Sequence, residues 1–116
     1  MLDYKFSLSI VVPTKNREKY AYITAEHILS ITNNKIQLVI QDNSDSNKLE
    51  ILLQRHLKDS RFTYNYTKEP LSFTENFSKA VSLAQGKYVC MIGDDDGINP
   101  EIVQLVEWAD NHNIDA

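Results

Sequence analysis

The stretch that decides the fold is Ser7–Val12, with the sequence SLSIVV, followed by Pro13. It is rich in β-branched residues and almost continuously apolar, which is typical of a strand buried on both faces. Pro13 has no N–H group to donate to a sheet, so the strand is predicted to end before it. Three further strands are predicted: Ile36–Ile40, Phe62–Tyr66 and Lys87–Ile92.

Helical segments lie between and after these strands. Glu18–Ile31 and Lys48–Lys58 have helical periodicity, and Ser72-Phe73-Thr74-Glu75 matches a capping box that begins a third helix. Gly86 is placed to end this third helix in a left-handed turn.

Asn99 can cap a last helix and Pro100 can open it. The residues expected on one face of the first helix and on the apolar face of the last are Tyr20, Ile23, His27, Ile31, Ile102, Leu105, Val106 and Ala109. The order βαβαβαβα predicts one α/β domain over residues 1–116, with a mostly parallel sheet covered by helices on both faces.

Composition supports a globular domain and excludes several classes. Apolar residues make up 42% of the 116 residues and charged residues 24%, close to the average for soluble domains. The longest apolar run is too short to cross a bilayer. The net charge of −4 argues against a surface that coats nucleic acid. The single Cys90 suits a reducing compartment.

Three of the predicted strands end in polar clusters: Pro13–Arg17, Asp42–Ser46 and Asp94–Gly97. Because ligands of parallel sheets bind beyond the carboxyl ends of the strands, these clusters should meet at one edge and form a site. Neither a G-x-G-x-x-G nor a P-loop motif is present, and the three histidines show no zinc-ligand spacing with one another or with Cys90.

Asp94, Asp95 and Asp96 are the sharpest chemical feature of the sequence. Three adjacent carboxylates repel one another, and a divalent cation relieves that repulsion by taking hard oxygen ligands. A solvated turn is the alternative. A calcium-binding EF-hand loop fails, because its first and last ligand positions would be Ile92 and Val103.

The other two clusters also suggest a ligand. Asp42 could accept hydrogen bonds from a base or a ribose, and its alternative role is to hold an Asx turn. Lys15 and Arg17 could pair with a diphosphate, and their alternative is a solvated loop.

Taken together, these segments resemble the nucleotide-sugar-binding part of a family 2 glycosyltransferase of the GT-A fold. The resemblance runs through Ser9–Arg17, Val39–Ser46, Glu75–Phe77, Ala84–Val89 and the segment from Gly93 to Pro100. It implies a Rossmann-like three-layer α/β/α sandwich. It also implies that the acceptor-binding half and the catalytic base lie outside these residues, so that the domain is truncated and inactive alone.

The resemblance assigns roles to individual residues. Asp42 matches the aspartate that contacts the base, while Thr14 and Arg17 would lie near the ribose and diphosphate. Asp94 and Asp96 form the D-x-D pair, but counting back from Pro100 places Asp95 at the metal. The nucleotide-sugar-binding residues implied are Pro13, Thr14, Lys15, Asn16, Arg17, Asp42, Asn76, Asp94 and Asp95, and the metal ligands are Asp94, Asp95 and Asp96.

Some residues depart from the family pattern. Lys15 stands where relatives often have an aromatic residue that stacks on the base, Gln41 replaces a frequent acid before Asp42, and Gly93 replaces another before Asp95.

The implied function is sugar transfer from a nucleotide-diphosphate sugar, with UDP preferred, to a saccharide or lipid-linked acceptor in bacterial polysaccharide or cell-surface glycan synthesis. Mn²⁺ or Mg²⁺ would be the cofactor. The implied location is cytoplasmic, at the membrane face in the full-length protein, and the domain could form a homodimer.

Two alternatives remain. The first is a non-catalytic doubly wound module for signalling or protein interaction, although a phosphoacceptor receiver wants acids where Pro13-Thr14-Lys15 stands. The second is a degenerate transferase domain that binds nucleotide without turnover.

Overall fold

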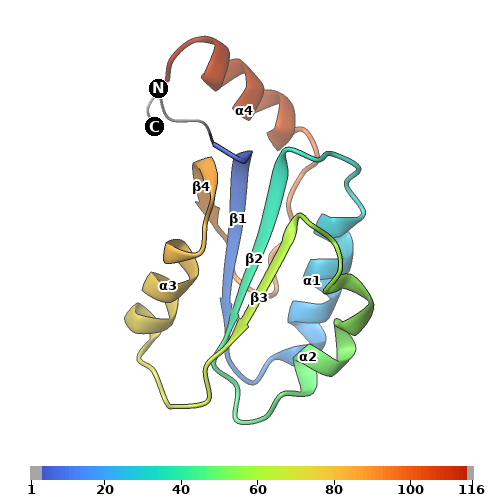
Figure 1. Cartoon of the computed structure of the whole chain (residues 1–116), viewed down its shortest axis with the longest axis vertical. Helices are drawn as coiled ribbons and strands as arrows, with labels where there is room; N and C mark the ends of the chain where they lie inside the picture. The colour runs from blue at the N-terminus through green and yellow to red at the C-terminus, as the bar shows by residue number, and fades with distance from the viewer. Residues whose placement is uncertain (1–3, 115–116) are drawn as a thin grey trace.

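The computed structural model describes residues 4–114, which form strands and helices in alternation (Figure 1). The elements are β1 (Phe6–Thr14), α1 (Glu18–Leu29), β2 (Ile36–Asp42), α2 (Lys48–Leu52), a 3₁₀ turn (Gln54–His56), β3 (Phe62–Tyr66), α3 (Phe73–Ser82), β4 (Gly86–Met91) and α4 (Ile102–Asn111).

The four strands form one parallel sheet in the order β3-β2-β1-β4. The helices α1 and α2 cover one face and α3 covers the other (Figure 1). The predicted α/β class, parallel sheet and three-layer arrangement are confirmed. Because the sheet is parallel, the carboxyl ends of all four strands lie at one edge, where the turns after β1 and β2 and the loop after β4 are found.

The core lies on both faces of the two central strands. On one face, Ile10 and Leu38 pack with the small residues Ala21 and Ala25 of α1. A smaller cluster on the opposite face is centred on Val11, Val39 and Ala80. β1 and β2 are therefore buried on both faces, as their mostly apolar sequences predict.

Burial differs from expectation at the sheet edge and on two helices. Val89 and Met91 of β4 are half-exposed, because α3 packs on β1 and β2 and leaves this edge strand uncovered. Tyr20 and Ile23 are exposed, since α1 instead turns its smaller residues to the sheet. Leu105 of α4 is also exposed, and Val106 carries the contact with the core.

Several predicted boundaries were wrong. β1 continues through Pro13 to Thr14, and the second helix breaks after Leu52 into the 3₁₀ turn. Gly86 has no positive φ and lies within β4, so it does not cap the preceding helix.

The start of the last helix also differs. The side chain of Asn99 accepts from the N–H of Glu101 at 2.9 Å, and the helix begins only at Ile102, with Glu101 as its N-cap residue. Within residues 4–114, no helix has the length and apolar character needed to span a membrane.

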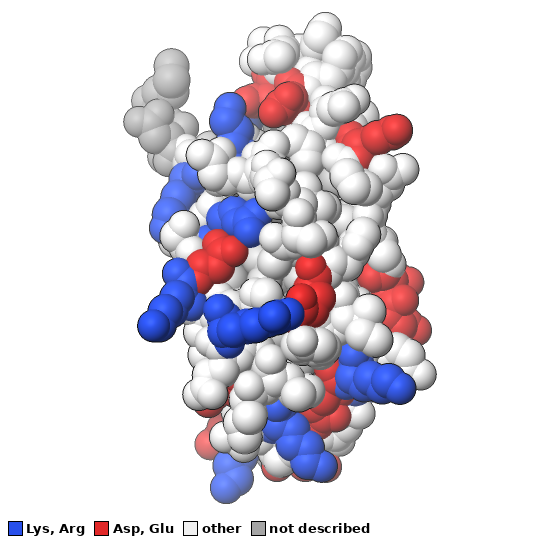
Figure 2. All heavy atoms as spheres, turned by 90° about the vertical axis from the view of Figure 1, so that its right-hand side faces the viewer, with Lys and Arg blue, Asp and Glu red and all other residues white. Residues whose placement is uncertain are grey.

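The face formed by α1 and α2 carries acidic and basic side chains in alternation (Figure 2). Part of this pattern is a cluster in which Glu26 of α1 accepts hydrogen bonds from Arg55 and from Nε2 of His56. These hydrogen bonds hold the pKa of Glu26 well below its usual value, at about 2. The cluster ties α1 to the 3₁₀ turn.

Candidate functional site

The polar clusters that follow β1 and β2 meet at the carboxyl edge of the sheet. The N–H of Asn43 donates to the carbonyl of Thr14 over 2.9 Å, and the N–H of Asn16 donates to Oγ of Ser44 over 2.7 Å. The Asn16 side chain donates to Asp45 and accepts from its N–H. Asn16 has a φ of 56°, which asparagine tolerates better than most residues. The predicted convergence of these two clusters is confirmed.

The third cluster, Asp94–Gly97, contacts the first one beyond the carboxyl ends of the neighbouring strands β1 and β4. The strand order reverses here, which is where ligands bind in open parallel sheets. Oγ1 of Thr14, at the end of β1, donates to Oδ2 of Asp94 over 2.8 Å. The Thr24 hydroxyl of α1 donates to the Asp94 carbonyl over 2.8 Å. The loop after β4 is therefore fixed to both β1 and α1.

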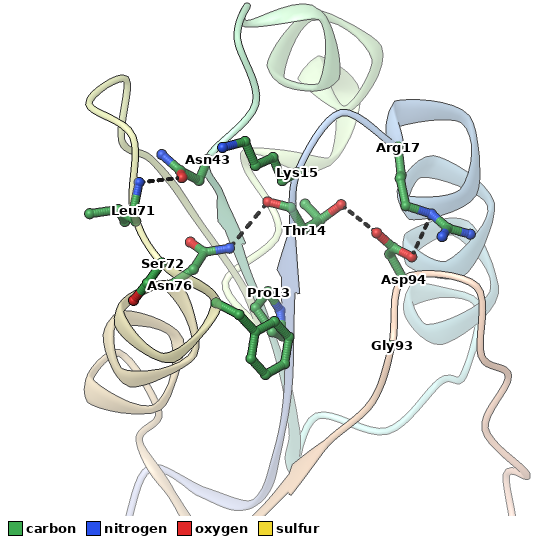
Figure 3. Close-up of a pocket in the computed structure, with 11 residues that line it drawn as sticks. Pro13, Thr14, Lys15, Arg17, Asn43, Leu71, Ser72, Asn76, Gly93 and Asp94 are labelled. Atoms are coloured by element: carbon green, nitrogen blue, oxygen red, sulfur yellow. Dashed lines mark hydrogen bonds and ion pairs between the residues drawn. The ribbon is translucent and has the colours of Figure 1, made fainter.

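A cavity of about 310 Å³ lies at this crevice (Figure 3). Six predicted site residues line it: Pro13, Thr14, Lys15, Arg17, Asn76 and Asp94. Asn16, Asp42, Asp95 and Asp96 are not among its lining residues. Four of the site residues predicted at the end of the first strand, Pro13, Thr14, Lys15 and Arg17, therefore line one cavity.

Five lining residues were not named as site residues from the sequence: Asn43, Leu71, Ser72, Phe73 and Gly93. Asn43 belongs to the polar cluster Asp42–Ser46, whereas Leu71, Ser72 and Phe73 come from the segment that begins α3. The side chain of Asn43 binds the segment before α3, donating to the carbonyls of Thr67 and Glu69 and accepting from the N–H of Leu71. The sequence signal for the α3 segment was the capping box, which makes Phe73 the first helical residue, and Phe73 is 72% exposed.

Asn76 is the buried polar residue of the cavity wall. It is only 6% exposed, and its Nδ2 donates to the Thr14 carbonyl over 3.2 Å. Figure 3 shows Thr14 linked to Asn76 on one side and to Asp94 on the other. Within the described residues, the Oδ1 of Asn76 is buried without a hydrogen-bond partner. Buried oxygens are rarely left unpaired, so this atom marks the cavity as a polar site.

Asp42 is fully buried at the end of β2. Its Oδ1 accepts from the N–H and the hydroxyl of Ser44 at 3.0 and 2.5 Å, and its Oδ2 accepts from the hydroxyl of Tyr64 at 2.6 Å. Burial and this last bond raise the pKa of Tyr64, which keeps its hydroxyl protonated as a donor. In this arrangement Asp42 holds a turn of the Asx type, the alternative its sequence position allowed; contact with a base stays a prediction.

The three adjacent aspartates turn to different partners. Nε of Arg17 lies 3.1 Å from Oδ1 of Asp94, and Nη2 of Arg17 lies 3.2 Å from Oδ2 of Asp95. Asp96 instead accepts from the N–H of Gly93 at 2.9 Å. Their mutual repulsion is therefore relieved by one shared guanidinium and one turn hydrogen bond.

Comparison with known proteins identifies the family to which this site belongs. Residues 9–116 match glycosyl transferase family 2, a region that includes every lining residue of the cavity. The chain belongs to this family.

Family 2 relatives resemble the chain over most of its length. The glycosyltransferase GlyG of Streptococcus pneumoniae is 26% identical over 100 residues, which cover 85% of this chain and 33% of that protein. The abequosyltransferase RfbV of Salmonella typhimurium is 26% identical over 108 residues, covering 86% and 31%. The chain therefore spans about a third of the length of these relatives.

A solved structure confirms the fold. The crystal structure of residues 1–349 of Staphylococcus aureus TarS aligns with a TM-score of 0.78 and 23% identity, covering 93% of this chain and 33% of that one. The predicted GT-A fold is thus correct for these residues.

Family 2 enzymes often use a divalent metal, so we tested whether these residues fit one. Within residues 4–114, no three His, Cys, Asp or Glu side chains form a ligand cluster. Arg17, however, shows that one cationic group can contact both Asp94 and Asp95. Two carboxylates are enough for Mg²⁺, which usually completes its shell with water and substrate phosphates. Asp94 and Asp95 therefore fit a metal shared with a phosphate ligand, while the oxygen of Asp96 that binds Gly93 serves the turn.

Proposed function

We propose that the cavity binds the nucleotide diphosphate of a sugar donor, with UDP as the expected nucleotide. The observation that carries this proposal is the position of the cavity, at the β1–β4 crevice of a family 2 chain. The two cations in its lining, Lys15 and Arg17, suit a ligand that carries negative charge. The mixed polar and apolar walls suit a nucleotide better than a purely charged ligand.

The apolar wall would receive the planar part of the nucleotide. Lys15 replaces the aromatic residue that often stacks on the base in relatives, but Phe73 lines the same cavity and is 72% exposed. An exposed aromatic ring beside Leu71 offers a stacking surface without any change in the core. Phe73 would thus supply the contact that Lys15 cannot.

The charged wall would hold the diphosphate. Lys15 and Arg17 would pair with phosphate oxygens, and Asp94 and Asp95 would hold Mn²⁺ or Mg²⁺ beside them. A bound metal would offset the negative charge that develops on the leaving nucleotide diphosphate. Thr14 would keep Asp94 oriented through its 2.8 Å hydrogen bond, close to the ribose and diphosphate.

In the whole protein, an acceptor hydroxyl would attack the anomeric carbon of the sugar, and the nucleotide diphosphate would leave. The acceptor would be a saccharide or a lipid-linked group at the cytoplasmic face of the membrane. A role in polysaccharide synthesis is supported by the relative TuaG of Bacillus subtilis, whose name associates it with teichuronic acid biosynthesis. We identify no residue here that is placed as the acceptor base, so these 116 residues alone should not transfer sugar.

Calorimetric titration tests the proposal. UDP, GDP, dTDP and ADP are each titrated into the chain with Mn²⁺ and then with EDTA. One nucleotide should bind in the presence of Mn²⁺, and Lys15→Ala should weaken its binding. Lys19→Ala is the matched control, because Lys19 is exposed and does not line the cavity. Failure of all four nucleotides to bind the folded chain, with or without Mn²⁺, would contradict the proposal.

A further inference from the structure

Arg17 has an unusual position in the site. It is the residue immediately before α1, and it reaches across to the loop after β4, where it contacts one oxygen each of Asp94 and Asp95. Its guanidinium carbon also lies 4.7 Å from the centre of the Tyr20 ring. The side chain is 45% exposed and lines the cavity (Figure 3). Arg17 therefore contacts both carboxylates and also lines the space proposed for the diphosphate.

We propose that Arg17 is a built-in counter-cation that a divalent metal must displace from Asp94 and Asp95. This inference rests on the proposed function of the site. Oδ2 of Asp94 is held by Thr14, so the oxygen paired with Arg17, Oδ1, is the one that a metal would take. A guanidinium and a divalent cation cannot both lie within about 3 Å of the same two oxygens, because their charges repel.

Displacement should be easy, because the ion pairs of Arg17 are partly solvated. The side chains of Arg17 and Asp95 are 45% and 53% exposed, whereas that of Asp94 is 10% exposed, and pairs with exposed partners contribute little net stability. The ring of Tyr20 already contacts the guanidinium in the paired state and can stay in contact with it after release. Arg17 would thus alternate between a state paired with the carboxylates and a state free to pair with a phosphate.

This alternation would couple the two ligands. Metal binding would release Arg17 toward the diphosphate, and a bound diphosphate would draw Arg17 away from the carboxylates and open them to the metal. Each ligand would then increase the affinity of the other by the same factor, as linkage requires. Arg17 is in this sense a positioning residue for the metal as well as a contact for the donor.

Mn²⁺ titration followed by electron paramagnetic resonance tests this proposal, since the signal of free Mn²⁺ decreases on binding. The chain is titrated without nucleotide and then with UDP, as wild type, Arg17→Gln and Arg17→Lys. Without nucleotide, Arg17→Gln should bind Mn²⁺ about two- to tenfold more tightly, the effect expected for removing two ion pairs that share one half-exposed guanidinium. UDP should increase the Mn²⁺ affinity of this variant by a smaller factor than in the wild type.

Two further variants control for charge and for folding. Lys19→Gln removes the same charge two residues away, and Lys19 forms no ion pair within the described part of the chain. Its Mn²⁺ affinity should equal that of the wild type. Arg17→Lys keeps the charge without the planar guanidinium and should fall between wild type and Arg17→Gln.

The outcomes separate this inference from the proposed function. Suppose that UDP binds the wild type, but the Mn²⁺ affinity of Arg17→Gln is no higher than that of the wild type or of Lys19→Gln. Arg17 is then not the competing cation. If neither the wild type nor Arg17→Gln decreases the signal of free Mn²⁺, with or without UDP, the proposed competition between Arg17 and the metal is also refuted. The proposed function fails separately, when no nucleotide binds in the calorimetric titration.

Discussion

Gly86 is expected to be the least replaceable glycine of the chain, for a reason that substitution can isolate. A Cβ atom at this position would lie 2.6 Å from the backbone nitrogen of Ser9 and 2.8 Å from the carbonyl carbon of Leu8. Both are main-chain atoms of β1, so the strands would have to move apart by several tenths of an ångström. The same shift would lengthen the 2.8 Å hydrogen bond from the N–H of Gly86 to Oγ of Ser9.

Gly86→Ala should therefore lower the free energy of unfolding by about 3 kcal/mol, at the upper end of ordinary overpacking. For a domain of this size, the melting temperature should fall by about 10 °C or more. Urea unfolding followed by circular dichroism measures the change. Gly97→Ala is the matched control, because its Cβ would meet nothing within 4 Å, and it should change stability by less than about 1 kcal/mol.

Gly86→Asn distinguishes close approach from backbone conformation. If Gly86 were a left-handed helix cap, asparagine would be tolerated better than alanine. If close approach decides, the larger asparagine should destabilise at least as much as alanine. A Gly86→Asn chain that unfolds at higher urea than Gly86→Ala, or a Gly86→Ala chain as stable as wild type, would refute the reasoning.

Three further results are expected. The pKa of Glu26 is lowered to about 2, first by Arg55 and then by His56, so the stabilisation from this carboxylate should be complete above pH 4.5 and lost as the pH falls toward 2. Glu26→Gln should flatten that part of a plot of melting temperature against pH. Phe73→Ala should weaken nucleotide binding several-fold in calorimetry and leave the melting temperature unchanged, because Phe73 is mostly exposed. Unchanged nucleotide affinity, or a lowered melting temperature, would contradict this role. Arg61→Lys should lower unfolding free energy by about 1–3 kcal/mol in urea titrations, because the guanidinium donates to carbonyls at the end of α1; an unchanged value would show that these bonds contribute nothing.

The sequence predicted the layers and the edge of the sheet where the cavity lies, because these depend on local patterns. Ser7–Val12 and Ile36–Ile40 are mostly apolar on both of their faces, a pattern typical of strands that are covered on both sides. The polar turns after them follow directly in sequence, so their convergence on one edge required no knowledge of side-chain packing.

The remaining features depend on contacts between residues distant in sequence. Tyr64 lies 22 residues after Asp42, and no pattern in the sequence around either residue indicates that the Tyr64 hydroxyl donates to the Asp42 carboxylate. The predicted cap at Gly86 was wrong for a similar reason, since its neighbour Ser9 is 77 residues away. Phe73 was taken only as part of a capping box, because its place in the same cavity as Lys15 depends on how α3 packs on the sheet.

The hydrogen bond from Gly86 to Ser9 belongs to a small polar network inside the sheet that has a consequence for folding. Oγ of Ser9 donates to Oε1 of Gln37 over 2.5 Å, and the N–H of Gln85 donates to the same oxygen over 2.8 Å. Apolar residues on both faces of a strand specify its pairing only weakly, because a shifted pairing still buries apolar side chains. A shift of one residue between β1 and β2, however, would place Ser9 and Gln37 on opposite faces of the sheet and break their hydrogen bond. The network thus favours the native register over a shifted one, because only the native register pairs these buried polar groups.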